Sequence, residues 1–201
     1  MVAANSAPDP VRSLQRPSAA RSRILATADR LFYAEGIRAV GVDRVVSEAK
    51  VTRATFYRHF PSKDHLITAY LAGRLERDQD QLNRLRRDHH DDSRAVLAGL
   101  ADVLAHQISS PGFRGCPYAN LTAEYCDVDH PARGIAGRHR SWFLSEVEQL
   151  LEDVGVGRAH IVAEQLVMLR AGAMAVASVG STPNVDAAFA QAWAALIEQP
   201  G

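Results

Sequence analysis

The spacing of apolar residues along the chain predicts an all-helical protein. From residue 18 onward, apolar side chains recur at intervals of three and four positions, which places them on one face of successive helices. Gly, Pro and short polar stretches separate these segments. The expected helices lie near residues 18–35, 42–49, 53–60, 63–85, 94–108, 131–154, 159–179 and 186–199, with a short apolar segment around residues 116–126.

Two of these helices are short and meet at a tight junction between Val42 and Phe60. In the first, the apolar positions fall on one face: Val42, Val45, Val46 and Ala49. The second begins after Thr52, whose hydroxyl can accept a hydrogen bond from a free backbone N–H of the first turn. We interpret the pair as a helix-turn-helix. An ordinary amphipathic helical hairpin is the alternative that spacing alone leaves open.

The second of these helices is rich in groups that bind nucleic acid. Its N-terminal residues would meet base edges in a major groove, where an arginine can donate two parallel hydrogen bonds to guanine. Lys63 stands in the first turn of the following helix, beside outward-facing N–H groups that suit a phosphate. The candidate DNA contacts are Arg44, Thr52, Arg53, Ala54, Thr55, Tyr57, His59 and Lys63.

A longer run, from Arg21 to Tyr70, resembles the DNA-binding domain of the TetR family of bacterial transcription regulators. The residues that carry the resemblance are Ile24, Ala28, Leu31, Phe32, Gly36, Val51, Thr55, Phe56, Tyr57, His59, Phe60, Lys63 and Leu66. The chain departs from the family pattern at Gly41, where a Ser or Thr N-cap is usual, and at Lys50, where a turn glycine is usual. A positive φ at Lys50 would cost about 1 kcal/mol relative to glycine.

Charge divides the chain into two parts. Up to Arg74, twelve Arg and Lys stand against six Asp and Glu, a net charge of +6, and the remainder carries −6. A basic N-terminal part can release counterions from DNA while the acidic remainder is repelled from it. We expect a disordered arm over residues 1–17, a helix-turn-helix domain over residues 18–66, and a helical ligand-binding and dimerisation domain over residues 67–201. Arg12 and Arg16 of the arm could lie along the DNA.

The last two expected helices are rich in alanine, and small residues allow helices to approach closely. The TetR resemblance implies that they form a four-helix homodimer interface. Burial of both helices inside a monomer is the alternative. A dimer would present two recognition helices about 34 to 36 Å apart, the spacing that a palindromic operator in double-stranded DNA requires.

The segment GCPYANLTAEYCDVDHPAR resembles a stretch found in one branch of TetR-family C-terminal domains, and the family implies an effector pocket among these helices. Apolar walls with a few polar groups are typical of a small-molecule site. The candidate ligand-binding residues are His106, Cys116, Tyr118, Asn120, Glu124, Tyr125, His139 and Trp142. A redox pair of Cys116 and Cys126 is an alternative. His89 to Asp92 would need a distant further ligand to hold a metal, so we predict no metal and no cofactor.

These observations predict a ligand-responsive homodimeric repressor that a small molecule releases from its operator. A composition of 47% apolar and 23% charged residues is typical of a soluble protein, and no run of about 18 apolar residues or secretory signal is evident. We therefore expect a cytoplasmic protein without a membrane partner. An enzyme using Cys116 or Cys126 with His106 or His139 lacks a supporting motif, and an unregulated architectural DNA-binding protein is the remaining alternative.

Overall fold

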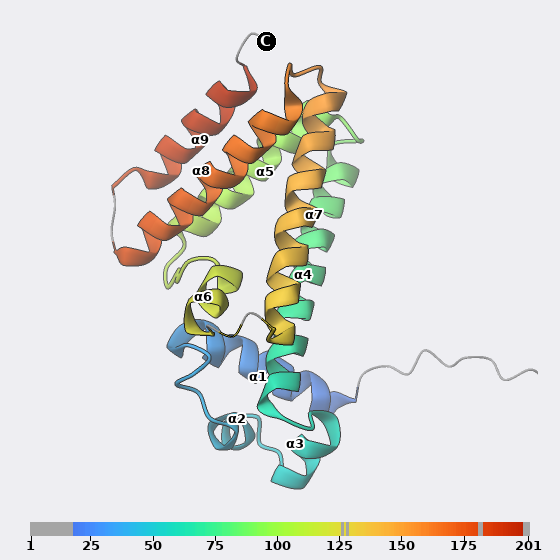
Figure 1. Ribbon diagram of the computed structural model, residues 1–201, viewed down its shortest axis with the longest axis vertical. Coiled ribbons are helices and arrows are strands. Elements are labelled where there is room, and N and C mark those ends of the chain that lie inside the picture. The colour runs from blue at the N-terminus through green and yellow to red at the C-terminus, as the bar shows by residue number, and fades with distance from the viewer. Residues whose placement is uncertain (1–17, 126, 128, 181–182, 199–201) are drawn as a thin grey trace, which may run out of the picture.

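The computed structural model describes residues 18–125, 127, 129–180 and 183–198, and this part of the chain forms an elongated all-α molecule (Figure 1). Its helices are α1 (Ala19–Glu35), α2 (Val42–Glu48), α3 (Arg53–His59), α4 (Lys63–Asp88), α5 (Ser93–Ser109), α6 (Pro117–Glu124), α7 (Pro131–Asp153), α8 (Ala159–Val179) and α9 (Val185–Ile197). Helices α1 to α3 form one end, and α5, α8 and α9 form the other. The predicted fold class is confirmed. The proposed arm, with Arg12 and Arg16, lies outside the described residues.

Side-chain caps explain where several helices begin. The side-chain oxygens of Ser18, Thr52, Ser62 and Asp92 each accept a hydrogen bond from a backbone N–H in the first turn of α1, α3, α4 and α5. The cap at Thr52 was predicted from the sequence. His130 caps α7, because its Nδ1 accepts a hydrogen bond from the N–H of Ala132 at 3.2 Å.

Helix α4 is longer than the apolar pattern indicated. It was expected to end near Leu85, but it continues through Arg86 to Asp88. Arg86 donates to Glu146 of α7 at 2.7 Å, so an ion pair between the two long helices holds the last turn. An apolar pattern does not detect a turn that a polar contact stabilises.

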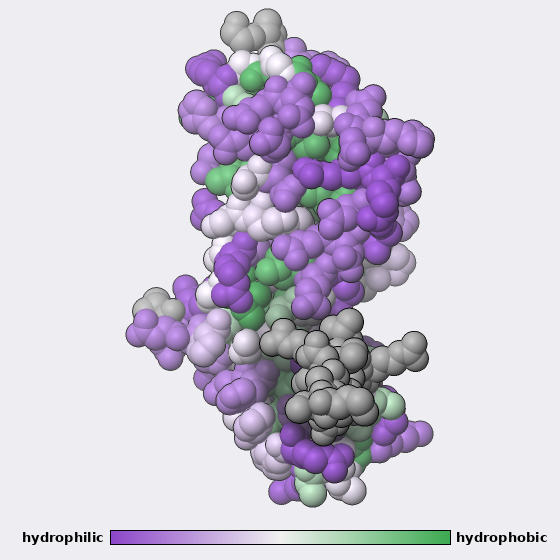
Figure 2. Space-filling model, turned by 90° about the vertical axis from the view of Figure 1, so that its right-hand side faces the viewer, coloured by the Kyte–Doolittle hydropathy of each residue, from purple (hydrophilic) through white to green (hydrophobic). Residues whose placement is uncertain are grey.

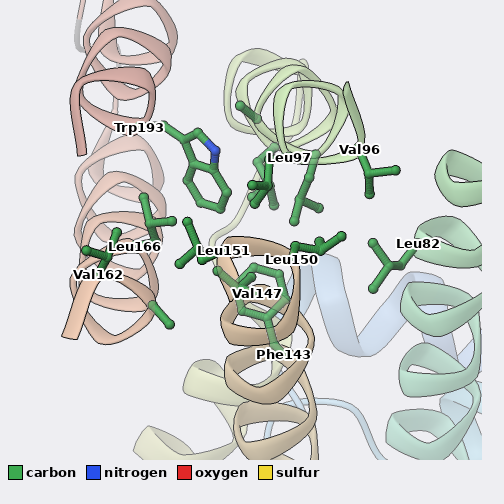
Figure 3. Close-up of a cluster of buried hydrophobic side chains, with 14 of the residues drawn as sticks. Leu82, Val96, Leu97, Phe143, Val147, Leu150, Leu151, Val162, Leu166 and Trp193 are labelled. Carbon is green, nitrogen blue, oxygen red and sulfur yellow. The ribbon is translucent and has the colours of Figure 1, made fainter. Parts of the chain in front are cut away.

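The apolar side chains form two cores along the molecule. The first joins α1, α2, α3 and the start of α4, and it also contains Tyr118 and Leu121 of α6 and Ile135 of α7. The second joins the end of α4 to α5, α7, α8 and α9 (Figure 3). In that view Trp193 of α9 points toward Leu97 of α5 and the leucines of α7. Helix α6 therefore packs with the helix-turn-helix end, although it follows α5 in the chain.

Helix α8 is the one helix of the described residues that is long and apolar enough to cross a membrane by length and composition. Polar residues such as Arg170 interrupt it, which is why no continuous apolar run was evident. It packs against α7, α9 and α5, yet it leaves large apolar side chains exposed: Ile161, Met168, Val176 and Val179. By contrast, hydrophilic side chains predominate on the side where α4 and α7 lie (Figure 2).

Candidate functional site

Helix α3 presents a polar face that its own apolar residues hold in place. Phe56 and Phe60 are buried in the first core and their rings lie 6.0 Å apart, while Arg21 of α1 lies over the Phe60 ring. The opposite face, which includes Arg53, Ala54 and Tyr57, is exposed. The buried rings fix the helix against α1, so these exposed groups form a surface on α3, which lies at one end of the molecule (Figure 1).

Two arginines near this surface, Arg53 of α3 and Arg44 of α2, are paired with acidic side chains of α1 and α2. Arg53 lies 2.6 Å from Asp43, and both side chains are more than 60% exposed, so water screens the pair and the arginine can exchange it for another partner. Arg44 pairs with Glu48 and with Glu35. Hydrogen bonds from Arg30 and Arg44 lower the pKa of the Glu48 carboxyl, so this cluster links α1 to α2.

The remaining predicted DNA contacts take part in local hydrogen bonds. Thr52 and Thr55 hydrogen-bond through their hydroxyls at 2.9 Å, and Nε2 of His59 lies 3.1 Å from the Ser18 hydroxyl. Lys63 donates to the carbonyl of Arg38 at 3.5 Å, and burial lowers the pKa of its amine. Thus Thr55, His59 and Lys63 are half-buried at the margin of the surface, and Arg53, Ala54 and Tyr57 stand out from it.

Two adjoining cavities lie in the other half of the molecule. The smaller has a volume of about 80 Å³ and lies between α4, α5 and α7, and the larger has a volume of about 530 Å³ and lies between α6, α7 and α8. The side chains that line both are Tyr118, His139, Phe143 and Arg170. The larger volume is within the range of small-molecule sites.

Tyr118 and His139 form a stacked pair at the wall between the cavities. Their ring centroids are 3.9 Å apart, and the Tyr118 hydroxyl donates to Asp78 of α4 at 2.8 Å. Burial raises the pKa of Tyr118, and burial also raises the pKa of Asp78. Asp78 lies 3.5 Å from His139 and favours the charged imidazole, but burial and the charge of Arg170 dominate and lower the pKa of His139 to about 3. His139 is therefore neutral at physiological pH.

The structure brings together four of the eight predicted ligand-binding residues. Cys116, Tyr118, His139 and Trp142 line the cavities. The other four do not line them: His106 is exposed on α5, Asn120 donates to the carbonyl of Arg114, Tyr125 packs on the ring of His130, and Glu124 binds the α1–α2 loop. Cys126, the other half of the suggested redox pair, lies outside the described residues.

Sequence reasoning missed Arg170 and Asp78. Arg170 is the single arginine or lysine of the apolar helix α8, and its guanidinium lies 4.8 Å from the centre of the Phe143 ring. An arginine in the middle of a long apolar helix was the signal that could have found it. Asp78 gave no such signal, because it stands in a charged stretch of α4.

Helix α6 connects the cavities to the helix-turn-helix. At one end Tyr118 lines the cavities, and at the other the Glu124 carboxylate accepts from the backbone N–H groups of Ile37 and Arg38 at 3.1 and 2.6 Å. Just before α6, the carbonyl of Gly115 accepts from the hydroxyl of Tyr33 in α1 at 3.1 Å. Helix α6 and the segment just before it therefore link the cavity wall to α1 and the loop that follows α1.

Comparison with known proteins agrees with this architecture. The family model for bacterial regulatory proteins of the tetR family matches residues 24–70. A crystal structure of SCO4454, a TetR-family transcriptional regulator from Streptomyces coelicolor, is 42% identical and superposes with a TM-score of 0.83, over 89% of this chain and 94% of that one. The chain belongs to the TetR family. Members of the TetR family are DNA-binding transcriptional regulators and not enzymes, so the cysteine enzyme considered above is excluded.

More distant TetR-family relatives share the fold. The HTH-type transcriptional repressor NemR of Escherichia coli is 24% identical over 134 residues, which is 66% of this chain and 67% of the relative. A crystal structure of the reduced form of E. coli NemR superposes with a TM-score of 0.80 at 21% identity, over 91% of this chain and 100% of that one. At this identity the superposition shows the common fold alone.

Proposed function

We propose that this TetR-family regulator is a cytoplasmic homodimeric repressor that a small molecule releases from a palindromic operator. The observation that carries the proposal is the double role of α6, which lines the cavities through Tyr118 and holds the α1–α2 loop through Glu124. A ligand that moves α6 would change the position of the recognition helix.

In this proposal α3 enters the major groove with Arg53 and Ala54 at its leading end. Arg53 exchanges Asp43 for a base edge, while Tyr57 and the marginal His59 and Lys63 meet phosphates. Arg44 pairs with Glu48 and Glu35, so its role in this proposal is to fix the position of α2. It contacts DNA only when it exchanges these acidic partners for phosphate.

The exposed side of α8 supports dimerisation. Ile161, Met168, Val176 and Val179 are between 44% and 89% exposed, and large apolar side chains gathered on one helix favour association. On α9 most of the exposed residues are alanines, including Ala187, Ala188 and Ala195, which allows a second helix pair to approach closely. A pair of α8 and α9 from each chain gives the four-helix arrangement of the proposed dimer.

Release follows from a shift between two conformations of the dimer. A ligand in the larger cavity would compete with the stacking of Tyr118 on His139 and with the bond of Tyr118 to Asp78 in α4. Both α4 and α6 lead to the helix-turn-helix, so the ligand favours a conformation with different spacing of the two recognition helices.

A gel-shift assay with the upstream region of the gene itself tests the proposal. We expect a specific complex that resists excess random DNA and dissociates with the correct effector. Arg53→Ala should weaken specific binding by about 1 to 3 kcal/mol and relax one base preference, whereas Lys63→Ala should weaken binding to all sequences and lower the salt slope. Equal losses on specific and random DNA for Arg53→Ala would contradict the role given to α3.

A thiol-based sensor is a second candidate. Cys116 is half-buried on the wall of the larger cavity, and the relative NemR has a structure described as its reduced form. If a thiol carries the signal, mild oxidation should release the operator and Cys116→Ser should abolish that release. Oxidant-independent binding by the unmodified protein would exclude this candidate.

A further inference from the structure

The larger cavity has an unbalanced charge. Three arginines line it, Arg133 of α7, Arg140 of α7 and Arg170 of α8, and none of the described residues that line it is Asp or Glu. Most of the remaining lining is apolar or aromatic, so the cavity combines positive charge with an apolar surface.

The three arginines differ in the hydrogen bonds and ion pairs that they make within the protein. Arg133 donates hydrogen bonds to the backbone carbonyls of Thr122 and Tyr125, so it caps the C-terminal end of α6. Arg140 is 70% exposed and lies 3.8 Å from Glu164, where water screens both groups.

Arg170 makes no hydrogen bond or ion pair with the described part of the chain, and its Nε is buried without a partner. Its guanidinium carbon lies over the Phe143 ring, at 4.8 Å from the ring centre. The negative group that acts on it, Asp78, is on the side of the smaller cavity and already accepts from Tyr118. A half-buried cation without a bonded partner favours an anionic ligand, because a carboxylate can bind guanidinium in two places.

We propose that the effector is a small carboxylate with an apolar body, which binds with its carboxylate on Arg170 and its body along Phe143, Tyr118 and Val167. This inference rests on the proposed function, since it names the ligand class of the same regulatory cavity. A cavity of about 530 Å³ accommodates either an aromatic ring system or a medium-length alkyl chain.

Isothermal titration of the full-length protein tests the charge requirement without DNA. The probes are 2-naphthoate and decanoate, each paired with its neutral alcohol, 2-naphthalenemethanol and 1-decanol. We expect one carboxylate to bind at least about tenfold more tightly than its alcohol, and the preferred body distinguishes an aromatic from an alkyl ligand. The proposal would be overturned if both alcohols bound as tightly as their carboxylates or more tightly. It would also be overturned if neither carboxylate bound.

Variants locate the site. Arg170→Gln should weaken carboxylate binding by about ten- to hundredfold and leave alcohol binding nearly unchanged, and Arg170→Lys should retain part of the affinity. Arg138→Gln is the matched control, because Arg138 is exposed on α7 and lines neither cavity.

Wild-type affinity for carboxylate in a folded Arg170→Gln protein would overturn the assignment of Arg170. The comparison of acid with alcohol tests the charge requirement even if that variant fails to fold. Specific operator binding with no carboxylate binding would reject this inference alone, whereas carboxylate binding without operator binding would reject the proposed function alone.

Discussion

Lys50 holds the turn between α2 and α3 in the left-handed region, with φ of 51°. The sequence left the sign of φ at Lys50 open, and the structure shows the positive φ that the family's usual glycine would accommodate. Gly41 likewise starts α2 without a side-chain cap, as its lack of a hydroxyl predicted. Turn conformations and helix caps depend on residues close together in the sequence, so the sequence itself indicates where they occur. The bonds of Glu124 to the α1–α2 loop and the position of Arg170 over the Phe143 ring could not be predicted, because they depend on segments brought together only by the fold.

Replacing Lys50 with glycine should stabilise the protein. Glycine adopts a positive φ without the steric cost that a Cβ imposes, so Lys50→Gly should raise the free energy of unfolding by about 1 kcal/mol. Urea denaturation measures the change. Lys50→Ala, which removes the same charge but keeps the Cβ, should give no such gain, and an equal gain from alanine would show that charge and not backbone strain is responsible.

His139 should make stability depend on pH. Its pKa is about 3 in the folded protein and near its ordinary value of 6.5 in the unfolded chain. Below pH 6.5 the unfolded chain therefore binds a proton that the folded protein does not, and stability falls as the pH decreases toward 3. Between pH 7.5 and 5 the loss from this group should reach about 2 kcal/mol.

The measurement compares wild type with His139→Phe by urea denaturation at both pH values. Phenylalanine keeps an aromatic ring beside Tyr118 and Phe143 but cannot bind a proton. The variant should lose less stability on acidification than wild type by about this amount. The same pH dependence in both proteins would mean that His139 is protonated in the folded state.

At the level of elements, α6 is the helix whose position the sequence described least well. Periodicity predicted the long helices and their order, because each has a wide apolar face. The segment around residues 116–126 was recognised only as a short apolar piece, and its packing against α1 could not be anticipated. That packing depends on Glu124, which was expected to bind ligand and instead binds the loop between α1 and α2. Gly36, with φ of 93°, is part of this junction, since a Cβ there would lie 3.4 Å from the Glu124 carboxylate.

Removing the Glu124 carboxylate should loosen the junction between α6 and the α1–α2 loop. Glu124→Ala leaves two backbone N–H groups without their acceptor, which should cost about 1 to 3 kcal/mol. Hydrogen exchange should show faster exchange of the Ile37 and Arg38 amides. Glu152→Ala, an exposed site on α7, is the control and should change stability by less than about 0.5 kcal/mol. Unchanged protection of both amides in Glu124→Ala would contradict the coupling through α6.

At the scale of the whole molecule, the apolar side of α8 and the hydrophilic side of α4 and α7 give the protein two unlike faces. The sequence predicted an Ala-rich pair of terminal helices but left open their burial within a monomer. The described structure leaves Met168 and Val176 exposed in the single chain, which favours the dimer.

Two negative charges introduced on the exposed apolar side of α8 should dissociate the dimer into monomers. The double variant Met168→Glu with Val176→Glu places unpaired carboxylates in the proposed interface, where desolvation and mutual repulsion oppose association. Light scattering should report a monomer, and specific DNA binding should decrease at least about a hundredfold. A control with Asn83→Glu and Ser145→Glu adds the same charge to exposed positions on α4 and α7, and it should remain dimeric. A dimeric Met168→Glu, Val176→Glu protein would place the interface elsewhere.

If a dimer reads DNA with two copies of α3, hydroxyl-radical footprinting on the upstream region of the gene shows it most directly. We expect two protected half-sites related by two-fold symmetry, with centres about 10 to 10.5 base pairs apart or a multiple of that spacing. Arg53→Ala should lose the protection in both half-sites together. Uniform protection along the fragment, or a single protected half-site at saturating protein, would contradict the claim.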